Sequence, residues 1–103
     1  MPYVSKQSRR YFDKEVHILV QRLLTYIGAG NLNYVLTRIC YGYLNRDTRG
    51  PRYEDYNEVI GVLECVKQEL YRRQVAPYED GKRSVNGDVY TPKPIDDGTQ
   101  TGT

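Results

Sequence analysis

The sequence has no tryptophan, one phenylalanine, one methionine, one histidine and two cysteines among its 103 residues. A single histidine excludes a cluster of histidine ligands, and Cys40 and Cys65 lack the spacing of a zinc site. Two cysteines are too few for a disulfide scaffold and favour a reducing, cytoplasmic setting. The chain also lacks an apolar run of about 18 residues, and its first residues lack a secretory signal, so we expect neither a membrane span nor export.

Motifs for catalysis are missing as well. The sequence has no glycine-rich loop of the kind that holds phosphates, and no local motif supports a cysteine nucleophile activated by His17. Asp80-Gly81-Lys82, which follows Glu79, is faintly similar to the last part of a metal-dependent nuclease motif. That chemistry needs a second carboxylate placed by a β-sheet, and no strand pattern is present. We therefore expect a protein that is not an enzyme and binds no metal or cofactor.

Apolar residues recur at helical spacing in three segments, which predicts an all-α fold, a small three-helix bundle. The expected helices span residues 6–27, 31–45 and 54–75, with Asn31 as the N-cap of the second. Glycine-rich breaks separate them. The apolar stripes are Val16, Leu19, Val20, Leu23, Leu24 and Ile27, then Leu32, Val35, Leu36, Ile39, Cys40 and Tyr43, then Tyr56, Val59, Ile60, Leu63, Val66 and Leu70.

Beyond the third helix the regular pattern weakens. Pro77 either follows the end of that helix or begins one more short helix over residues 77–83. Residues 85–90 have the turn signal of a very small hairpin. The last residues are too polar to offset the entropy of ordering, so we expect a helical domain of residues 1–85 and a flexible tail of residues 86–103.

The balance of core and charge bears on assembly. Three helices in about 80 residues give a thin core, which favours a homo-oligomer, although a monomeric bundle remains open. Residues 1–52 carry nine Lys and Arg against three Asp and Glu, whereas residues 53–103 carry six against ten. The net charges of +6 and −4 favour head-to-tail contact between helices or subunits, and they equally allow a basic face for an anionic ligand.

The best candidate for an anion site is the loop with Arg46, Arg49 and Arg52, followed by Tyr53. Guanidinium groups match phosphate in a bidentate manner, and a tyrosine ring can stack on a nucleobase. The structural alternative is a solvated loop whose arginines pair with the nearby acidic residues, Asp47, Glu54 and Asp55.

A second group of basic residues lies at the end of the third helix and after it: Arg72, Arg73 and Lys82. Cations near a helix C-terminus stabilise the helix dipole, which explains the first two without a ligand. Arg38 on the second helix is expected to face inward and to pair with Glu64 or Glu69.

Several segments together resemble a family of short, uncharacterised proteins encoded by tailed bacteriophages. The similarity covers residues 32–90 and brings no activity or binding site with it. Its segments are Leu32-Asn33-Tyr34 with Thr37-Arg38, Gly61-Val62-Leu63-Glu64-Cys65-Val66-Lys67 with Glu69 and Tyr71-Arg72-Arg73, Pro77-Tyr78-Glu79 with Lys82, and Asn86-Gly87-Asp88-Val89-Tyr90.

This resemblance implies a protein of the cytoplasm of an infected bacterium, and two function classes then compete. The first is an oligomer that binds a nucleotide or nucleic acid through arginine and tyrosine side chains, for example to sequester a host defence signal. The second is an interaction or virion-assembly protein that binds a host or phage protein through an apolar helix face. The abundance of tyrosine, 11 residues, favours the first.

Overall fold

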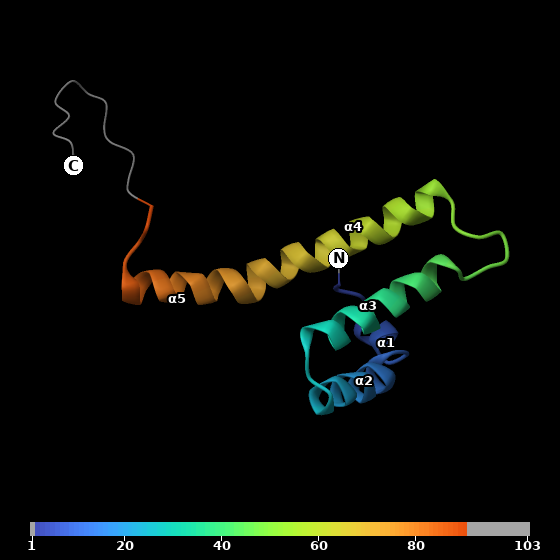
Figure 1. The fold of residues 1–103 in the computed structure, drawn as a ribbon, viewed down its shortest axis with the longest axis horizontal. Helices are drawn as coiled ribbons and strands as arrows, with labels where there is room; N and C mark the ends of the chain where they lie inside the picture. The colour runs from blue at the N-terminus through green and yellow to red at the C-terminus, as the bar shows by residue number, and fades with distance from the viewer. Residues whose placement is uncertain (1, 91–103) are drawn as a thin grey trace, which may run out of the picture. The chain divides into compact units, whose positions relative to one another are not determined.

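The computed structural model describes residues 2–90, and over this range the chain is all-α, as the sequence predicts. Two units, residues 1–67 and residues 68–103, are distinguished, with their boundary inside one helix. Residues 91–103 lie outside the described part, so the predicted tail of residues 86–103 stays a prediction. In chain order the elements are α1 (Lys6–Arg9), α2 (Asp13–Thr25), α3 (Ala29–Leu44), α4 (Tyr53–Leu70), the π-helical segment η1 (Tyr71–Val75) and α5 (Ala76–Asn86) (Figure 1).

The first predicted helix is two helices. The Ser5 hydroxyl accepts a hydrogen bond of 3.1 Å from the Ser8 N–H and caps α1. Tyr11 and Phe12 then donate to carbonyls three residues back, over 3.2 and 3.0 Å, which tightens the turn and ends the α-helical pattern. The pattern resumes where Val16 donates to the Phe12 carbonyl over 2.9 Å. The prediction of one continuous helix over residues 6–27 was wrong at this aromatic pair, whose helix propensity is low.

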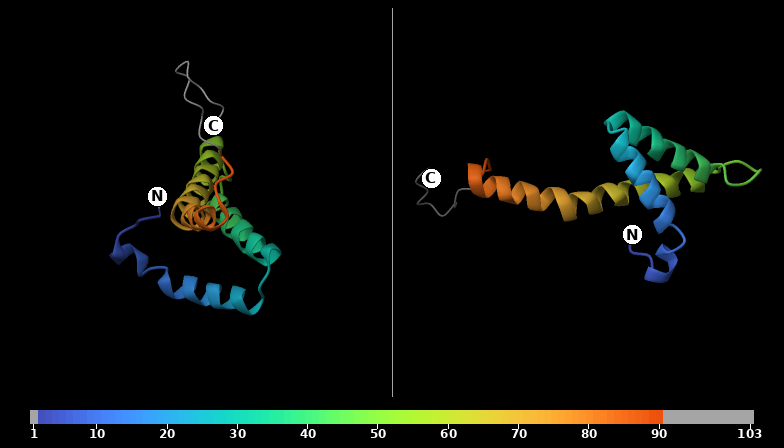
Figure 2. Two further views of the ribbon diagram at one scale, coloured as in Figure 1. Left: turned by 90° about the vertical axis from the view of Figure 1, so that its left-hand side faces the viewer. Right: turned by 90° about the horizontal axis from the view of Figure 1, so that it is seen from below.

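The second predicted helix is α3, which begins two residues earlier than expected. Gly28 is its N-cap, so the assignment of Asn31 to that role was wrong. The Asn31 amide instead donates a hydrogen bond of 2.8 Å to the Tyr26 carbonyl at the end of α2. Figure 2 shows α3 leaving α2 at a steep angle. The asparagine therefore joins two helices across their link.

The third predicted helix changes from α-helical to π-helical after Leu70, ahead of a proline. After α4, the N–H of Ala76 donates to the Tyr71 carbonyl, five residues back, which makes η1 a π-helical turn. Pro77 lies in the first turn of α5, as one of the two sequence alternatives predicts. A proline lacks an N–H and clashes with the carbonyl four residues earlier, and a wider turn relieves that clash.

The end of α5 differs from the sequence prediction. The helix extends to Asn86, three residues beyond the predicted end, and Gly87 caps it with a φ of 91°. That left-handed conformation suits glycine. Residues 85 and 86 are helical and residues 87–90 contain no strand, so the small hairpin that the turn signal allowed at residues 85–90 is not formed. Asp88 accepts a hydrogen bond of 2.9 Å from the Tyr90 N–H in a local turn.

α3 and α4 lie next to each other at the loop that joins them, yet most of the apolar side chains in the described range remain exposed to solvent. In Figures 1 and 2, α3 and the first part of α4 both extend away from the loop that joins them, with opposite chain directions, and draw apart with distance from it. Of the apolar side chains in the described range, Val59 alone is buried, with 8% of its surface exposed. The predicted apolar stripes are present, yet most of their members remain exposed. Within residues 2–90, the helices are too short or too polar to cross a lipid bilayer.

Candidate functional site

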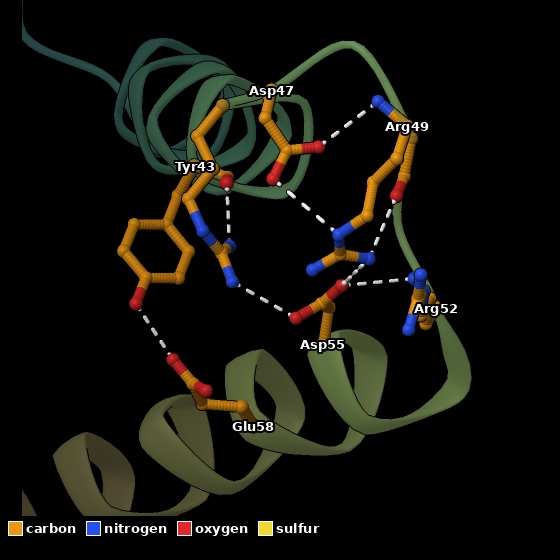
Figure 3. Close-up of polar contacts among 8 residues, drawn as sticks. Tyr43, Asp47, Arg49, Arg52, Asp55 and Glu58 are labelled. Atoms are coloured by element: carbon orange, nitrogen blue, oxygen red, sulfur yellow. Dashed lines mark hydrogen bonds and ion pairs between the residues drawn. The ribbon is translucent and has the colours of Figure 1, made fainter.

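The predicted anion-binding loop joins α3 to α4, and a local turn shapes it. The Asp47 carboxylate accepts a hydrogen bond of 3.1 Å from the Arg49 N–H (Figure 3). Gly50 has a φ of 75°, a value that glycine adopts without strain, and Pro51 follows it. The loop is thereby turned back toward the start of α4.

The carboxylate of Asp55, in the first turn of α4, contacts three residues of this loop (Figure 3). Its Oδ2 accepts a hydrogen bond of 2.9 Å from the Arg52 N–H and lies 3.1 Å from Arg49 Nη1. Its Oδ1 accepts a hydrogen bond of 2.9 Å from Arg46 Nη2. The side chain is only 10% exposed. The Arg52 N–H first, and then the Arg49 and Arg46 guanidinium groups, hold the pKa of the Asp55 carboxyl at about 2, below its ordinary value of 3.8.

Arg46 also contacts the last turn of α3. Its Nη1 donates a hydrogen bond of 2.9 Å to the Tyr43 carbonyl, and its guanidinium lies 4.5 Å from the centre of the Tyr43 ring. The Tyr43 hydroxyl donates a hydrogen bond of 2.6 Å to Glu58 on α4. That bond to a carboxylate raises the pKa of Tyr43. Arg46 and Tyr43 thus tie α3 to α4 at the loop end.

The four residues predicted first for ligand binding therefore fall into two pairs. Arg46 and Arg49 pair with acidic residues of the chain, which is the structural alternative that the sequence left open. Tyr53 is 76% exposed, and Arg52 is exposed. Among the described residues, the Arg52 guanidinium forms no hydrogen bond or ion pair.

The second predicted group belongs to the unit of residues 68–103. Arg72 forms an ion pair with Glu69, and Lys82 lies over the Tyr78 ring, 5.7 Å from its centre. Arg73 lies in η1. The prediction for Arg38 was wrong: it is exposed and donates a hydrogen bond of 3.1 Å to the Tyr34 hydroxyl one turn earlier on α3.

Two apolar grooves flank the contact between α3 and α4, and Cys40 and Leu63 line both of them. The first has a volume of about 440 Å³ and the second about 270 Å³. The remaining residues of the first groove are Asn33, Leu36, Thr37, Tyr41 and Leu44, and those of the second are Ile39, Tyr43, Glu58, Val59 and Val62.

The positions of the two cysteines and of the acidic residues bear on thiol and metal chemistry. Cys40 is half-buried between the two grooves, and Cys65 is exposed. In the part of the chain from residue 2 to residue 90, His, Cys, Asp and Glu side chains form no group of three that is arranged to hold a metal ion. The chemistry that the arrangement does offer is apolar contact along α3 and α4.

Sequence reasoning named Asp55 only as one of several partners for the arginines, and it gave Glu58 no role. A signal for Asp55 exists in the sequence. An acidic residue three positions after an N-cap and just before an apolar run is half of a capping box, and Asp55 stands in that relation to Arg52. Glu58 has no such local signal, because its partner Tyr43 lies on another helix.

In the comparison with protein families, a model described as "Domain of unknown function (DUF6899)" matches residues 1–89. Neither the curated proteins nor the solved structures contain a match to the chain. The bacteriophage setting stays a prediction, because the family description says nothing of origin. With 89 of its 103 residues matched, the chain belongs to the family of the domain of unknown function DUF6899.

Proposed function

We propose that the chain is a small, non-enzymatic helical interaction protein whose apolar helix faces are completed by a partner polypeptide. The observation that carries this proposal is the exposure of the helices. Among the described residues Val59 is the one buried apolar side chain, and α3 has no buried residue. Arg38 is the single charged residue among the 16 of α3. A helix with so little charge is normally covered on most of its sides.

The energetics support the same reading. Burying a large apolar side chain contributes about 1.5–3 kcal/mol, so covering the exposed half of one contributes roughly 1 kcal/mol. Eight half-exposed side chains on α3 and α4 would together contribute roughly 8 kcal/mol, an upper estimate that equals the net stability of a typical domain. The eight are Leu36, Ile39, Tyr43, Tyr56, Ile60, Val62, Leu63 and Val66.

Hydrogen exchange tests this proposal. Under dilute conditions in which light scattering gives the mass of a monomer, we expect the amides of α3 and α4 to exchange with little protection. When a partner polypeptide covers the apolar faces of α3 and α4, the protection of the same amides against exchange should rise by at least about tenfold. Local opening of the helices then exposes apolar surface that the partner had covered, and this makes opening less frequent. A dilute monomer with strongly protected α3 amides and a cooperative thermal transition would contradict the proposal.

A second candidate function is the binding of a phosphate-bearing ligand, such as a nucleotide signal or nucleic acid. The exposed Arg52 and Tyr53, side by side at the start of α4, favour it. The local charge disfavours it: between residues 46 and 58, three arginines face four acidic residues. Sequestration of a defence signal in the cytoplasm of an infected bacterium belongs to this second candidate. Its mark would be a steep loss of affinity with rising salt.

A further inference from the structure

The grooves beside α3 and α4 are formed by a helical hairpin, the segment of residues 29–67. Tyr43 with Glu58 and Arg46 with Asp55 hold its loop end together. All the residues that line the two grooves come from α3 and α4, so α2 does not close either of them. The hairpin therefore presents an open apolar surface on both sides of the Cys40–Leu63 line.

We infer that a second copy of the chain occupies this surface, so that two hairpins of residues 29–67 form a four-helix bundle. This inference rests on the proposed function and names its partner. Four-helix bundles are built from two helical pairs whose apolar faces meet in a common core. An isologous dimer supplies those pairs from one kind of chain, since the same surface patch serves on both subunits.

The area available on the hairpin matches what a dimer needs. A stable interface removes about 800 Å² from each partner. The eight side chains named above are each about half exposed, for example Ile39 at 55% and Val62 at 56%. With roughly 100 Å² of exposed surface for each, they offer roughly 800 Å². One hairpin thus carries enough apolar surface for one copy of itself.

Charge indicates which helices meet. From residue 53 to residue 67, α4 carries four acidic residues and Lys67, a net charge of −3, whereas α3 carries Arg38 alone. Two α4 helices facing each other would place like charges together, and that pairing is unfavourable. The pairing of α3 with the α4 of the second copy brings opposite charges together. We therefore place α3 against α4 of the other copy.

The experiment is sedimentation velocity of the full chain from about 1 to 200 μM, with thermal unfolding followed in parallel. The wild-type chain should dimerise, and its Tm should rise with concentration. Ile39→Glu places a charge in the second groove and should weaken dimerisation by roughly 100-fold or more. Gly42→Glu is the matched control on the same helix, because Gly42 lines neither groove and a side chain there meets nothing of its own chain within 4 Å. It should leave the dissociation constant unchanged within about threefold.

Because Ile39→Glu could simply unfold the chain, a mixing experiment accompanies it. Ile39→Glu and Val62→Lys are purified separately and then combined, and native mass spectrometry measures the dimers. If α3 of one copy meets α4 of the other, the mixed dimer should exceed either homodimer by at least about tenfold, since opposite charges then meet. An absence of mixed dimer, with both variants helical by circular dichroism, would overturn the proposed pairing.

The remaining outcomes separate this inference from the proposed function. A wild-type chain that stays monomeric at 200 μM and unfolds without cooperativity would overturn the second copy as the occupant and leave the interaction function standing. A monomer with a cooperative transition would overturn both, because the chain then covers its own faces. A dimer that Gly42→Glu disrupts and Ile39→Glu does not would place the interface on a side of α3 outside the two grooves and overturn the inference.

Discussion

Arg46 donates a hydrogen bond of 2.9 Å from Nη2 to Oδ1 of Asp55, across the loop between α3 and α4. The same carboxylate accepts the Arg52 N–H at the start of α4, so one side chain both caps a helix and holds the preceding loop. Arg46 and Arg49 are exposed by a little more than a third, and Asp55 is buried beneath them. This cluster sets the geometry of the loop end of the hairpin.

Replacement of Asp55 tests that role through pH. The Asp55 pKa lies at about 2 in the folded chain and near 3.8 when unfolded, so the unfolded state binds more protons between these values. The stabilisation is complete above about pH 4 and is lost as the pH falls toward 2. Asp55→Asn should lower the Tm at pH 7 by several degrees and flatten the decline of Tm between pH 4 and 2.

Thermal unfolding by circular dichroism measures both effects. Asp47→Asn is the control on the same loop, because Asp47 is more exposed and its ion pair with Arg49 is longer, 3.5 Å. It should change the Tm by much less. Equal losses in the two variants, or an unchanged acid decline in Asp55→Asn, would show that Asp55 does not hold the loop.

The sequence predicted helices more successfully than contacts. The repeats at Leu36, Ile39 and Tyr43 predicted α3 because helix periodicity is a local property of the chain. The break at Phe12 was missed because the apolar stripe begins only at Val16, so the pattern does not show where the helix before it is interrupted. The pairing of Tyr43 with Glu58 joins residues 15 apart, and no local pattern encodes such a pair.

The candidate site shows the same division. The sequence identified Arg46 and Arg49 as neighbours and left two readings open, ligand binding and pairing with nearby carboxylates. Only the structure shows that both reach Asp55, because side-chain direction depends on the turn at Gly50. Fewer apolar side chains are buried in the structure than the predicted thin core implies. The periodicity of a sequence shows which face of a helix is apolar, but it does not show what covers that face.

Leu63→Asp tests the packing of the hairpin. Leu63 is 38% exposed and lines both grooves, so a charge there lies in apolar surroundings on either side. We expect the Tm to fall by roughly 10 °C or more, since each 1 kcal/mol shifts the Tm of a small domain by about 4–8 °C. The free energy lost should be roughly 2 kcal/mol or more.

Cys65→Asp is the matched control for this variant, because Cys65 is an exposed residue on the same helix. It should stay within about 0.5 kcal/mol of the wild-type stability. If Leu63→Asp melted like the wild-type chain, α4 would not pack through its apolar stripe. If Cys65→Asp were the more damaging variant, the covered side of α4 would be the opposite one.

Arg52→Ala tests the phosphate-binding candidate. Its guanidinium forms no hydrogen bond or ion pair among the described residues, so removal should leave the helical circular dichroism unchanged. If the loop binds a nucleotide, the double variant Arg49→Ala with Arg52→Ala should abolish the fluorescence polarisation of a labelled nucleotide. Arg52→Ala alone should weaken that binding by roughly tenfold, the loss of one charged hydrogen bond. Unchanged affinity in the double variant would remove this loop as a site.

Tyr71→Phe tests the unit of residues 68–103. The Tyr71 hydroxyl, in the first position of η1, donates a hydrogen bond of 2.6 Å to Glu79 on α5. That bond, and then the Glu79 charge, raise the pKa of Tyr71 above its ordinary value of 10.0. The folded state therefore holds this proton more tightly, and the stabilisation is complete below pH 10 and is lost as the pH rises through the raised pKa. In Tyr71→Phe the helical circular dichroism below pH 10 should be weaker than in the wild-type chain. The further loss of helix signal as the pH rises through the raised Tyr71 pKa should be absent.

Glu79→Gln tests the same bond from its other end. It should return the Tyr71 pKa, measured by ultraviolet titration against Tyr71→Phe, toward 10.0. An identical titration curve in Glu79→Gln would mean that η1 and α5 are not joined by this bond.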